Sequence, residues 1–82
     1  MIDPHWFRIG EVAATLGVKP HVIRFWEGEF KRWVRPERSR SGQRVYSRRD
    51  VERLTQIREL LWVERYTIRG ARRRMAAEGE AA

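Results

Sequence analysis

The first third of the chain carries apolar residues at helical spacing. The apolar side chains between residues 9 and 16 share one arc of a helical wheel: Ile9, Val12, Ala13 and Leu16. Gly17 follows, and glycine suits the left-handed conformation in which helices often end. Pro20 fits the first position of a second helix, because its missing amide hydrogen is not needed there. The pattern predicts helices over 9–16 and 20–30.

The second predicted helix separates an apolar side from a mainly polar side. Its apolar side consists of Val22, Ile23, Trp26 and Phe30. Its opposite side consists of His21, Arg24, Phe25 and Gly28. We expect Ile23, Trp26 and Phe30 to be core residues, because they share one stripe. Two short helices joined by a turn that contains glycine predict a helix-turn-helix.

A hairpin is predicted after the second helix. Residues 33–36 and 43–46 are short strand candidates, and the polar segment between them contains Gly42. A hairpin that follows a helix-turn-helix is called a wing, and we expect the wing over residues 33–46.

Two further helices complete the pattern. Ser47 and Asp50 match the Ser/Thr-x-x-Asp/Glu signature of a helix start, and this helix is expected to run to about Arg65. Its apolar stripe consists of Leu54, Ile57 and Leu61, flanked by Val51 and Leu60. Thr67 is placed to cap a last helix, whose stripe consists of Ile68, Ala71 and Met75. The predicted fold is mainly α: a winged helix-turn-helix over residues 6–76, with a flexible head at 1–5 and a fraying tail at 77–82.

Length and charge narrow the possible functions. The chain has 82 residues, which corresponds to one small domain. Its 18 Lys and Arg residues oppose 11 Asp and Glu residues, and the formal net charge is +7. The sequence pI of about 11.2 exceeds the value of ~9 above which nucleic-acid binding is suspected. Hydrophobic residues make up 41% of the chain, enough for a core and too much for a disordered basic tail.

Other classes of protein are disfavoured by what the sequence lacks. It contains no cysteine, which excludes disulfides, a cysteine zinc site and a thiol nucleophile. It has no Ser/His/Asp arrangement and no phosphate loop, and His5 and His21 have no evident metal-binding partners. We therefore expect no enzyme, no metal and no cofactor. No apolar run approaches the ~18 residues of a membrane span and no secretory signal is recognisable, so a cytoplasmic protein is expected.

Several short segments occur together in a characteristic order over roughly residues 6–76. They are Ile9-Gly10-Glu11-Val12-Ala13, Gly17-Val18, Ile23-Arg24-Phe25-Trp26-Glu27, Pro36 with Arg38, Gly42-Gln43-Arg44-Val45-Tyr46 and Asp50-Val51. In this order and spacing the chain resembles the N-terminal winged-helix DNA-binding domain of the MerR family of bacterial transcription regulators. Each segment alone is a weak signal, and together they are a strong one.

The resemblance implies a particular mode of DNA binding. Family members bind pseudo-palindromic promoter DNA as dimers, with each recognition helix in a major groove and the wing on the flanking backbone. Activators distort an over-long promoter spacer so that RNA polymerase engages both promoter elements, which makes the polymerase an indirect partner. The family's long dimerisation helix and an effector region do not appear in this sequence. We therefore interpret the chain as a DNA-binding fragment or minimal member, monomeric by itself and a homodimer in a full-length parent.

The chain departs from the family pattern at positions that matter for DNA contacts. Arg8 stands where many members begin the first helix with Ser or Thr. Val22, Phe25 and Trp26 stand where many members carry Thr and a pair of Tyr residues. The phosphate contacts of those hydroxyl groups are therefore not carried over to this chain. The lack of cysteine also argues against soft-metal sensing.

Candidate DNA contacts lie on the mainly polar side of helix 20–30. A major groove admits one helix, and Arg24 in mid-helix is expected to contact DNA, the alternative being a solvated arginine paired with Glu27. His21 is a candidate donor to a phosphate or a base edge, and Lys19 at the helix N-terminus suits a backbone phosphate. Phe25 packs either on a deoxyribose or thymine methyl group or over the base of the wing, and we slightly favour the second.

The wing is the second candidate surface. Six arginines fall within 15 residues, opposed only by Glu37: Arg35, Arg38, Arg40, Arg44, Arg48 and Arg49. Arg44 and Tyr46 occupy alternate strand positions, so they point to one side, and they match a family pair that grips phosphate. The wing residues expected to contact DNA are Arg38, Arg40, Arg44 and Tyr46. The alternatives are a solvated loop for the arginines and a core ring with a water-exposed hydroxyl for Tyr46.

Two features near the C-terminus leave alternatives open. One is a basic run that either approaches the DNA backbone or forms a solvated helix face, and it consists of Arg69, Arg72, Arg73 and Arg74. The other is the pair Trp62 and Val63, at the edge of the third helix's stripe. These residues either abut a missing dimer helix or second subunit, or Trp62 is tucked under the fourth helix.

Three functions are compatible with the sequence. The leading one is a sequence-specific double-stranded DNA-binding domain of a transcription regulator. The second is an excisionase-like architectural protein that bends phage DNA for recombination, which the short length suits well. The third is a protein-interaction module whose basic face meets an acidic partner.

Overall fold

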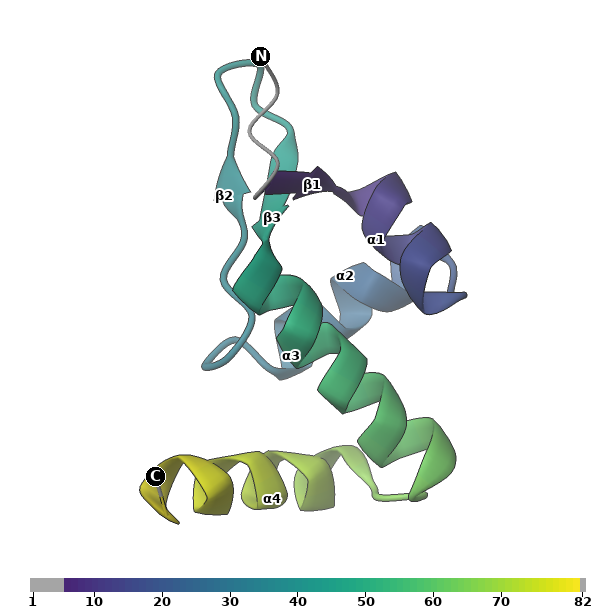
Figure 1. The fold of residues 1–82 in the computed structure, drawn as a ribbon, viewed down its shortest axis with the longest axis vertical. Coiled ribbons are helices and arrows are strands. Elements are labelled where there is room, and N and C mark those ends of the chain that lie inside the picture. The colour runs from purple at the N-terminus through teal and green to yellow at the C-terminus, as the bar shows by residue number, and fades with distance from the viewer. Residues whose placement is uncertain (1–5, 82) are drawn as a thin grey trace.

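The computed structural model describes residues 6–81. In chain order the elements are β1 (Trp6–Arg8), α1 (Ile9–Leu16), α2 (Pro20–Glu29), β2 (Glu37–Arg38), β3 (Arg44–Ser47), α3 (Arg48–Arg58), the π-helical segment η1 (Glu59–Val63) and α4 (Ile68–Ala81). In Figure 1 the sheet and its hairpin stand at the top, α1 and α2 lie beside and behind α3, and α4 crosses beneath the lower end of the α3–η1 rod. This arrangement confirms the predicted winged helix-turn-helix. The head expected at residues 1–5 lies outside the described residues.

The junction of α1 and α2 follows the predicted turn chemistry. Gly17 has a φ of 71°, the left-handed conformation that favours glycine. The Val18 amide donates to the Ala13 carbonyl at 3.0 Å, which satisfies a carbonyl that the helix end would otherwise leave unpaired. Pro20 occupies the first turn of α2, as predicted. The turn therefore holds the two helices at the short separation of a helix-turn-helix.

The prediction of a strand at residues 33–36 is wrong. The first strand of the wing, β2, comprises only Glu37 and Arg38. The amides of Trp33 and Val34 both donate to the Phe30 carbonyl at 3.0 Å and continue the end of α2 as a turn. Val34 is buried in the core. The apolar character of this segment reflects packing beneath the wing and not the alternation of a strand.

The sheet contains a strand that the sequence pattern does not reveal. Its order is β1-β3-β2, and both pairings are antiparallel. The unpredicted strand β1 places Phe7 opposite Tyr46 and Arg8 opposite Val45. A strand of three residues is too short to show alternation, so only its pairing with β3 defines it. This pairing fixes the start of α1 against the wing.

The start of α3 is a reciprocal cap, as predicted. The Asp50 amide donates to the Ser47 hydroxyl and the Ser47 amide donates to the Asp50 carboxylate, both at 3.0 Å. The second carboxylate oxygen of Asp50 accepts the Arg35 amide at 3.0 Å. Asp50 is only 5% exposed. One buried carboxylate therefore joins the segment before the wing to the helix after it.

The last part of the chain continues the predicted helices with two differences. The third helix changes from α to π geometry at Glu59, and the fourth runs to Ala81, so residues 77–81 are helical where the sequence predicts a fraying tail. The π-helical turn alters the helical period, and Leu60 is buried while Leu61 is only partly buried. The Arg58 guanidinium donates to the Leu16 carbonyl at 2.8 Å and ties α3 to the end of α1. None of the helices within residues 6–81 has the length and apolar character needed to cross a membrane.

The core lies where the helices and the sheet meet. Its buried side chains include the predicted Ile23 and Trp26 of α2, Phe30 directly after α2, and the predicted Ala71 and Met75 of α4. The expectation that these residues form the core is confirmed. Since α2 buries this stripe, its opposite side is available at the surface.

Arg65 provides a test of backbone strain in the turn between η1 and α4. Its φ of 63° places a Cβ-bearing residue in the left-handed region, which costs roughly 1 kcal/mol through crowding of the Cβ atom. We expect Arg65→Gly to raise the free energy of unfolding by about 0.5 kcal/mol, after the entropic cost of glycine in the unfolded chain is subtracted. Urea titration measures the change. Arg65→Ala retains the Cβ atom and is expected to give no gain, and a destabilised glycine variant would contradict the strain.

Candidate nucleic-acid interface

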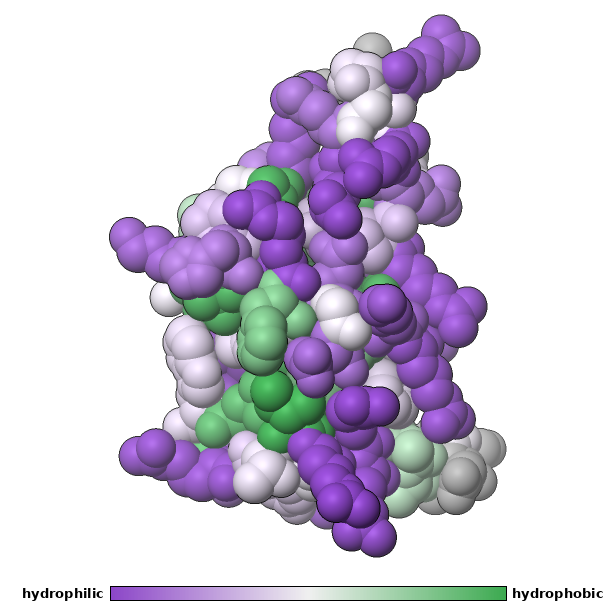
Figure 2. All heavy atoms as spheres, turned by 180° about the vertical axis from the view of Figure 1, so that it is seen from behind, coloured by the Kyte–Doolittle hydropathy of each residue, from purple (hydrophilic) through white to green (hydrophobic). Residues whose placement is uncertain are grey.

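The outward side of α2 presents the residues predicted to contact DNA. His21 and Arg24 are exposed, and Phe25 is 54% exposed, whereas Ile23 and Trp26 on the other side are buried. Because so much of Phe25 is exposed, the slightly favoured prediction that this ring covers the base of the wing gains no support. Helix α2 lies at the back in Figure 1 and toward the viewer in Figure 2, where hydrophilic side chains surround a small apolar patch. The outward side of the helix therefore presents an arginine, a histidine and an aromatic ring.

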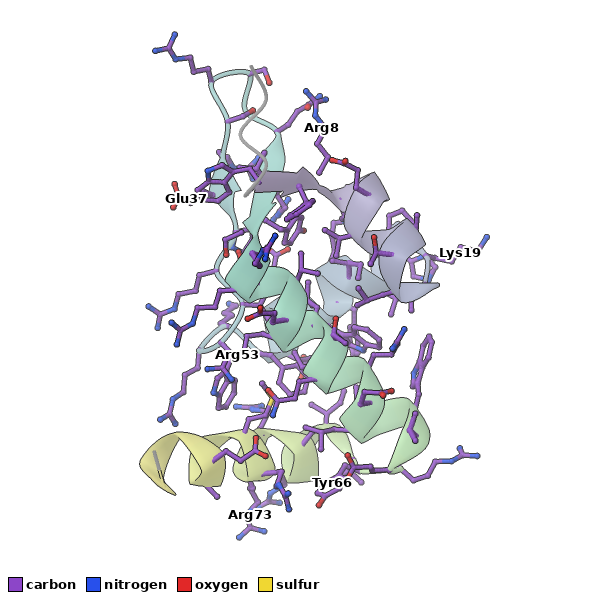
Figure 3. All side chains as sticks on the ribbon, viewed as in Figure 1. Arg8, Lys19, Glu37, Arg53, Tyr66 and Arg73 are labelled. Atoms are coloured by element: carbon purple, nitrogen blue, oxygen red, sulfur yellow. The ribbon has the colours of Figure 1, made fainter. Side chains whose placement is uncertain are left out.

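A hollow lies where α1, α2 and the wing meet. Its charged lining consists of Arg8, Glu11, Arg24, Arg38 and Arg44. One Nη atom of Arg38 donates to the Gly42 carbonyl at 2.8 Å, which holds this guanidinium within the wing. Figure 3 shows Arg8 at the start of α1, beside the wing. With four arginines against one glutamate, the hollow is positively charged and suits an anion.

A carboxylate on α2 holds the wing strand β3 against the helix. One oxygen of Glu27 accepts the Arg44 Nε–H at 3.0 Å, and the other accepts the Tyr46 hydroxyl at 2.9 Å. The side chains of Glu27 and Arg44 are 15% and 38% exposed. The two contacts confirm that Arg44 and Tyr46 point to one side of the strand. They also correct the pairing considered for Glu27, because within residues 6–81 its ion pair is with Arg44 and not with Arg24.

Tyr46 is a core residue. Its ring is fully buried, and burial together with the hydrogen bond to Glu27 and the charge of Glu27 raises the pKa of its hydroxyl well above the usual value. The hydroxyl donates its hydrogen bond to the Glu27 carboxylate and not to water. This placement differs from the predicted phosphate contact, because a buried hydroxyl that already donates to Glu27 is not available to DNA.

The other predicted contacts lie outside the hollow or at its rim. Arg40 is exposed between β2 and β3, at the tip of the hairpin. Lys19 is the residue that precedes α2, and Figure 3 shows it projecting outward at the end of α1 that is remote from the wing. The structure thus brings Arg24, Arg38 and Arg44 together in one hollow. It leaves Lys19, His21 and Arg40 at separate points of the surface.

A second basic groove lies between the end of α2 and α4. Its cations are Lys31, Arg32, Arg69, Arg72 and Arg73, with Glu29 and Trp33 beside them. The guanidinium carbon of Arg32 lies 5.3 Å from the centre of the Trp33 ring. Arg74 is not among the lining residues and forms an ion pair with Glu78 at 3.3 Å. The basic run of α4 is therefore divided, with three of its four arginines in the groove.

Trp62 and Val63 form an exposed apolar pair at the end of η1. They are 51% and 67% exposed. The Trp62 ring meets Trp26 edge-on, with the ring centres 5.4 Å apart. Trp62 is therefore not tucked under α4, and about half of its surface faces solvent together with Val63.

Sequence reasoning missed two functional features of this surface. The contacts of Glu27 span 17 and 19 residues, and no local spacing signals a pair so far apart. Arg8 stood out only as a departure from the family pattern, and its place in the hollow depends on the unpredicted strand β1. A local rule, such as helical or strand periodicity, finds neither feature.

The two helices joined by a turn, the hairpin beside them and the arginine-lined hollow between them define a class of protein: a winged helix-turn-helix domain. Comparison with known proteins identifies the family. The chain belongs to the MerR helix-turn-helix family of regulatory proteins, whose model matches residues 7–78. It is also 41% identical over 54 residues to the mercuric resistance operon regulatory protein of Bacillus cereus, a match that covers 66% of this chain and 40% of the relative. The chain thus spans well under half of that relative's length. No solved structure matches the chain.

Proposed function

We propose that this chain is the sequence-specific double-stranded DNA-binding domain of a bacterial MerR-like transcription regulator. In this proposal α2 enters a major groove and the wing lies on the flanking backbone. The observation that carries the proposal is the convergence of Arg24 from α2 with Arg38 and Arg44 from the wing on one positively charged hollow. In a duplex, Arg24 on α2 would face base edges in the major groove, while the wing arginines would face the adjacent phosphates.

The proposed contacts of α2 follow from what each side chain presents. Arg24 lies in mid-helix and reads a guanine through two parallel hydrogen bonds, the commonest specific contact in major grooves. His21, one turn nearer the N-terminus, donates to a base edge or a phosphate. Lys19 binds a phosphate where its charge adds to the positive end of the helix. Phe25, 54% exposed, packs on a deoxyribose or a thymine methyl group.

The proposed contacts of the wing are electrostatic. Arg38, Arg40 and Arg44 bind backbone phosphates and carry no sequence information directly. Within the described part of the chain, Arg38 donates to the Gly42 carbonyl and Arg44 to the Glu27 carboxylate. An arginine has five N–H donors, so each keeps others for a phosphate.

The proposed assembly is a homodimer in a longer protein. The matched segment covers 40% of the B. cereus relative, and in this proposal the longer protein supplies the dimerisation helix. The exposed pair Trp62 and Val63 is the apolar surface available for that contact. RNA polymerase is an indirect partner, reached through distortion of promoter DNA. By itself this chain is a monomer and binds one half-site weakly, because a dimer doubles the contacts and raises the effective concentration.

Selection from a random duplex library tests the proposal. The chain, fused to a neutral dimerising helix, is selected at two salt concentrations. We expect an inverted repeat to be enriched. If each domain neutralises roughly 5–7 phosphates, half-site affinity falls on the order of a thousandfold between 50 and 200 mM salt.

Three other outcomes would each contradict the proposal in a different way. Salt-sensitive binding without an enriched motif indicates an architectural or non-specific protein. Cooperative binding to tandem sites, with bending of the duplex, indicates an excisionase-like function. The absence of binding, with an intact fold by circular dichroism, indicates a protein partner for the basic face.

A further inference from the structure

Glu27 is an acidic residue on the helix that is proposed to enter the DNA, which calls for an explanation. A carboxylate there repels phosphate, and at an exposed position it would also be a candidate to read cytosine. Its side chain is only 15% exposed, and both of its oxygens are occupied, by Arg44 Nε and by the Tyr46 hydroxyl. Base reading by Glu27 would therefore require both contacts to break.

We infer that Glu27 is a positioning residue, which locks the wing strand to the recognition helix and orients the Arg44 guanidinium toward a single backbone phosphate in the hollow. The inference rests on the proposed function, because it concerns how the same surface binds DNA.

The geometry of arginine explains how one contact orients the group. A guanidinium is planar and carries its five N–H donors in a rigid fork. When Glu27 takes the Nε–H at 3.0 Å, the plane of the group is restrained and the outer Nη donors remain. Arg44 lines the hollow together with Arg8, Arg24 and Arg38. The outer donors of Arg44 are thus held in the one region where three other arginines also gather.

The second contact of Glu27 explains how the wing is held. Strand β2 pairs with β3 at only two positions, so the hairpin has little sheet structure to fix its angle. Tyr46 is fully buried in the core, and its hydroxyl donates to Glu27 at 2.9 Å. The carboxylate therefore bridges α2 and the buried end of β3. Helix and wing are expected to dock on DNA as one body, without the entropic cost of ordering the wing on binding.

The inference differs from simple electrostatics in the sign of the expected effect. Removing a negative charge near a phosphate should tighten binding if charge alone matters. If Glu27 orients Arg44, removing it should weaken binding, because Arg44 loses its position. The salt dependence differs as well, since the loss of one phosphate contact lowers the slope of log K against log salt by about 0.9.

The experiment measures binding of the 82-residue chain to the duplex half-site selected above, by fluorescence anisotropy at several salt concentrations. We expect Glu27→Ala to weaken binding about tenfold and to lower the salt slope by about one, as Arg44→Ala does. The Glu27→Ala/Arg44→Ala double variant should bind like Arg44→Ala alone, within about twofold, because both changes remove the same contact. Glu27→Gln retains an acceptor for Arg44 Nε and an amide that donates to the Tyr46 oxygen, and should recover most of the affinity.

Two further variants separate positioning from folding and from charge. Glu27→Ala leaves the Tyr46 hydroxyl buried without a partner, which destabilises the fold by itself. The Glu27→Ala/Tyr46→Phe variant removes that hydroxyl, so it should melt near the wild-type temperature and still bind about tenfold more weakly. Glu37→Ala removes an exposed acid of β2 and should bind as tightly as the wild type or slightly more tightly.

Each contrary result has a distinct meaning. The inference is overturned if the folded Glu27→Ala/Tyr46→Phe variant binds like the wild type or more tightly, or if the losses from Glu27→Ala and Arg44→Ala simply add. Failure of the wild-type chain to bind any duplex overturns the proposed function itself, and the inference with it.

Discussion

An Arg24→Ala variant is expected to bind its selected duplex roughly 10- to 100-fold more weakly and to lose the preference for guanine at one position of each half-site. The reason is that a bidentate arginine contact contributes about 1–3 kcal/mol of discrimination against the wrong base. Arg24 is exposed on the outward side of α2, and no acidic side chain within residues 6–79 lies within ion-pair distance of it. Its donors are therefore not engaged by an ion pair with any of these side chains.

Matched variants separate base reading from the loss of one positive charge. Arg74→Ala removes an arginine that lies outside both basic surfaces and is paired with Glu78, and it should leave sequence preference unchanged. Arg24→Lys keeps the charge but loses the planar fork, so it should retain salt-dependent binding while relaxing the guanine preference. Repeating the library selection with each variant measures the preference directly. An Arg24→Ala variant that selects the wild-type motif with unchanged affinity would remove Arg24 from the interface.

The largest effect on stability is expected at Asp50, where Asp50→Ala should lower the free energy of unfolding by about 3 kcal/mol. Asp50 is 5% exposed and accepts the Arg35 and Ser47 amides, each at 3.0 Å. Alanine leaves both part-buried amides without this acceptor, and an unsatisfied buried donor costs about 1–3 kcal/mol, so a total of about 3 kcal/mol is expected for the pair. The total free energy of unfolding of a domain of this size is roughly 4–12 kcal/mol. The variant should therefore unfold at a much lower urea concentration.

Two milder substitutions test whether the two amide contacts account for that loss. Ser47→Ala removes the hydroxyl that caps α3 but retains the Asp50 carboxylate, and it should lower the free energy of unfolding by about 1 kcal/mol. Asp50→Asn keeps one side-chain oxygen as an acceptor, so its free energy of unfolding should lie between those of Asp50→Ala and the wild type. Urea unfolding followed by circular dichroism ranks the three variants. The interpretation fails if Asp50→Ala is no less stable than Ser47→Ala, since the Arg35 contact would then contribute nothing.

Helices were the part of the fold that local sequence predicted well. The first helix has the predicted bounds, Ile9–Leu16, and the second begins at Pro20, because caps and turns depend on neighbouring residues. The strand at 33–36 failed for the opposite reason: Val34 is apolar because it fills the core beneath the wing, and strand alternation has no part in it. Strand β1 was missed because three residues carry too little pattern.

The candidate site likewise has features that local sequence predicted and features that only the tertiary structure showed. Helical periodicity alone placed His21, Arg24 and Phe25 on the outward side of α2 and Ile23 and Trp26 in the core. Composition alone gave the basic field of the wing. Neither indicated that Tyr46 is buried with its hydroxyl on Glu27, which differs both from the expected phosphate contact and from the alternative of a core ring with a water-exposed hydroxyl.

By itself the amino-acid sequence determined the order of the helices, the mainly polar outward side of α2 and the family to which the chain belongs. These follow from residues within a few positions of each other and from motif order along the chain. Only the tertiary structure decided which polar groups lie together. It joins Glu27 to Arg44 and Tyr46, and Asp50 to the Arg35 amide. It also places Arg8 around one hollow with the wing arginines. These residues lie as many as 36 positions apart, in the case of Arg8 and Arg44, and their partners are chosen by the packing of whole helices and strands, which no local pattern encodes.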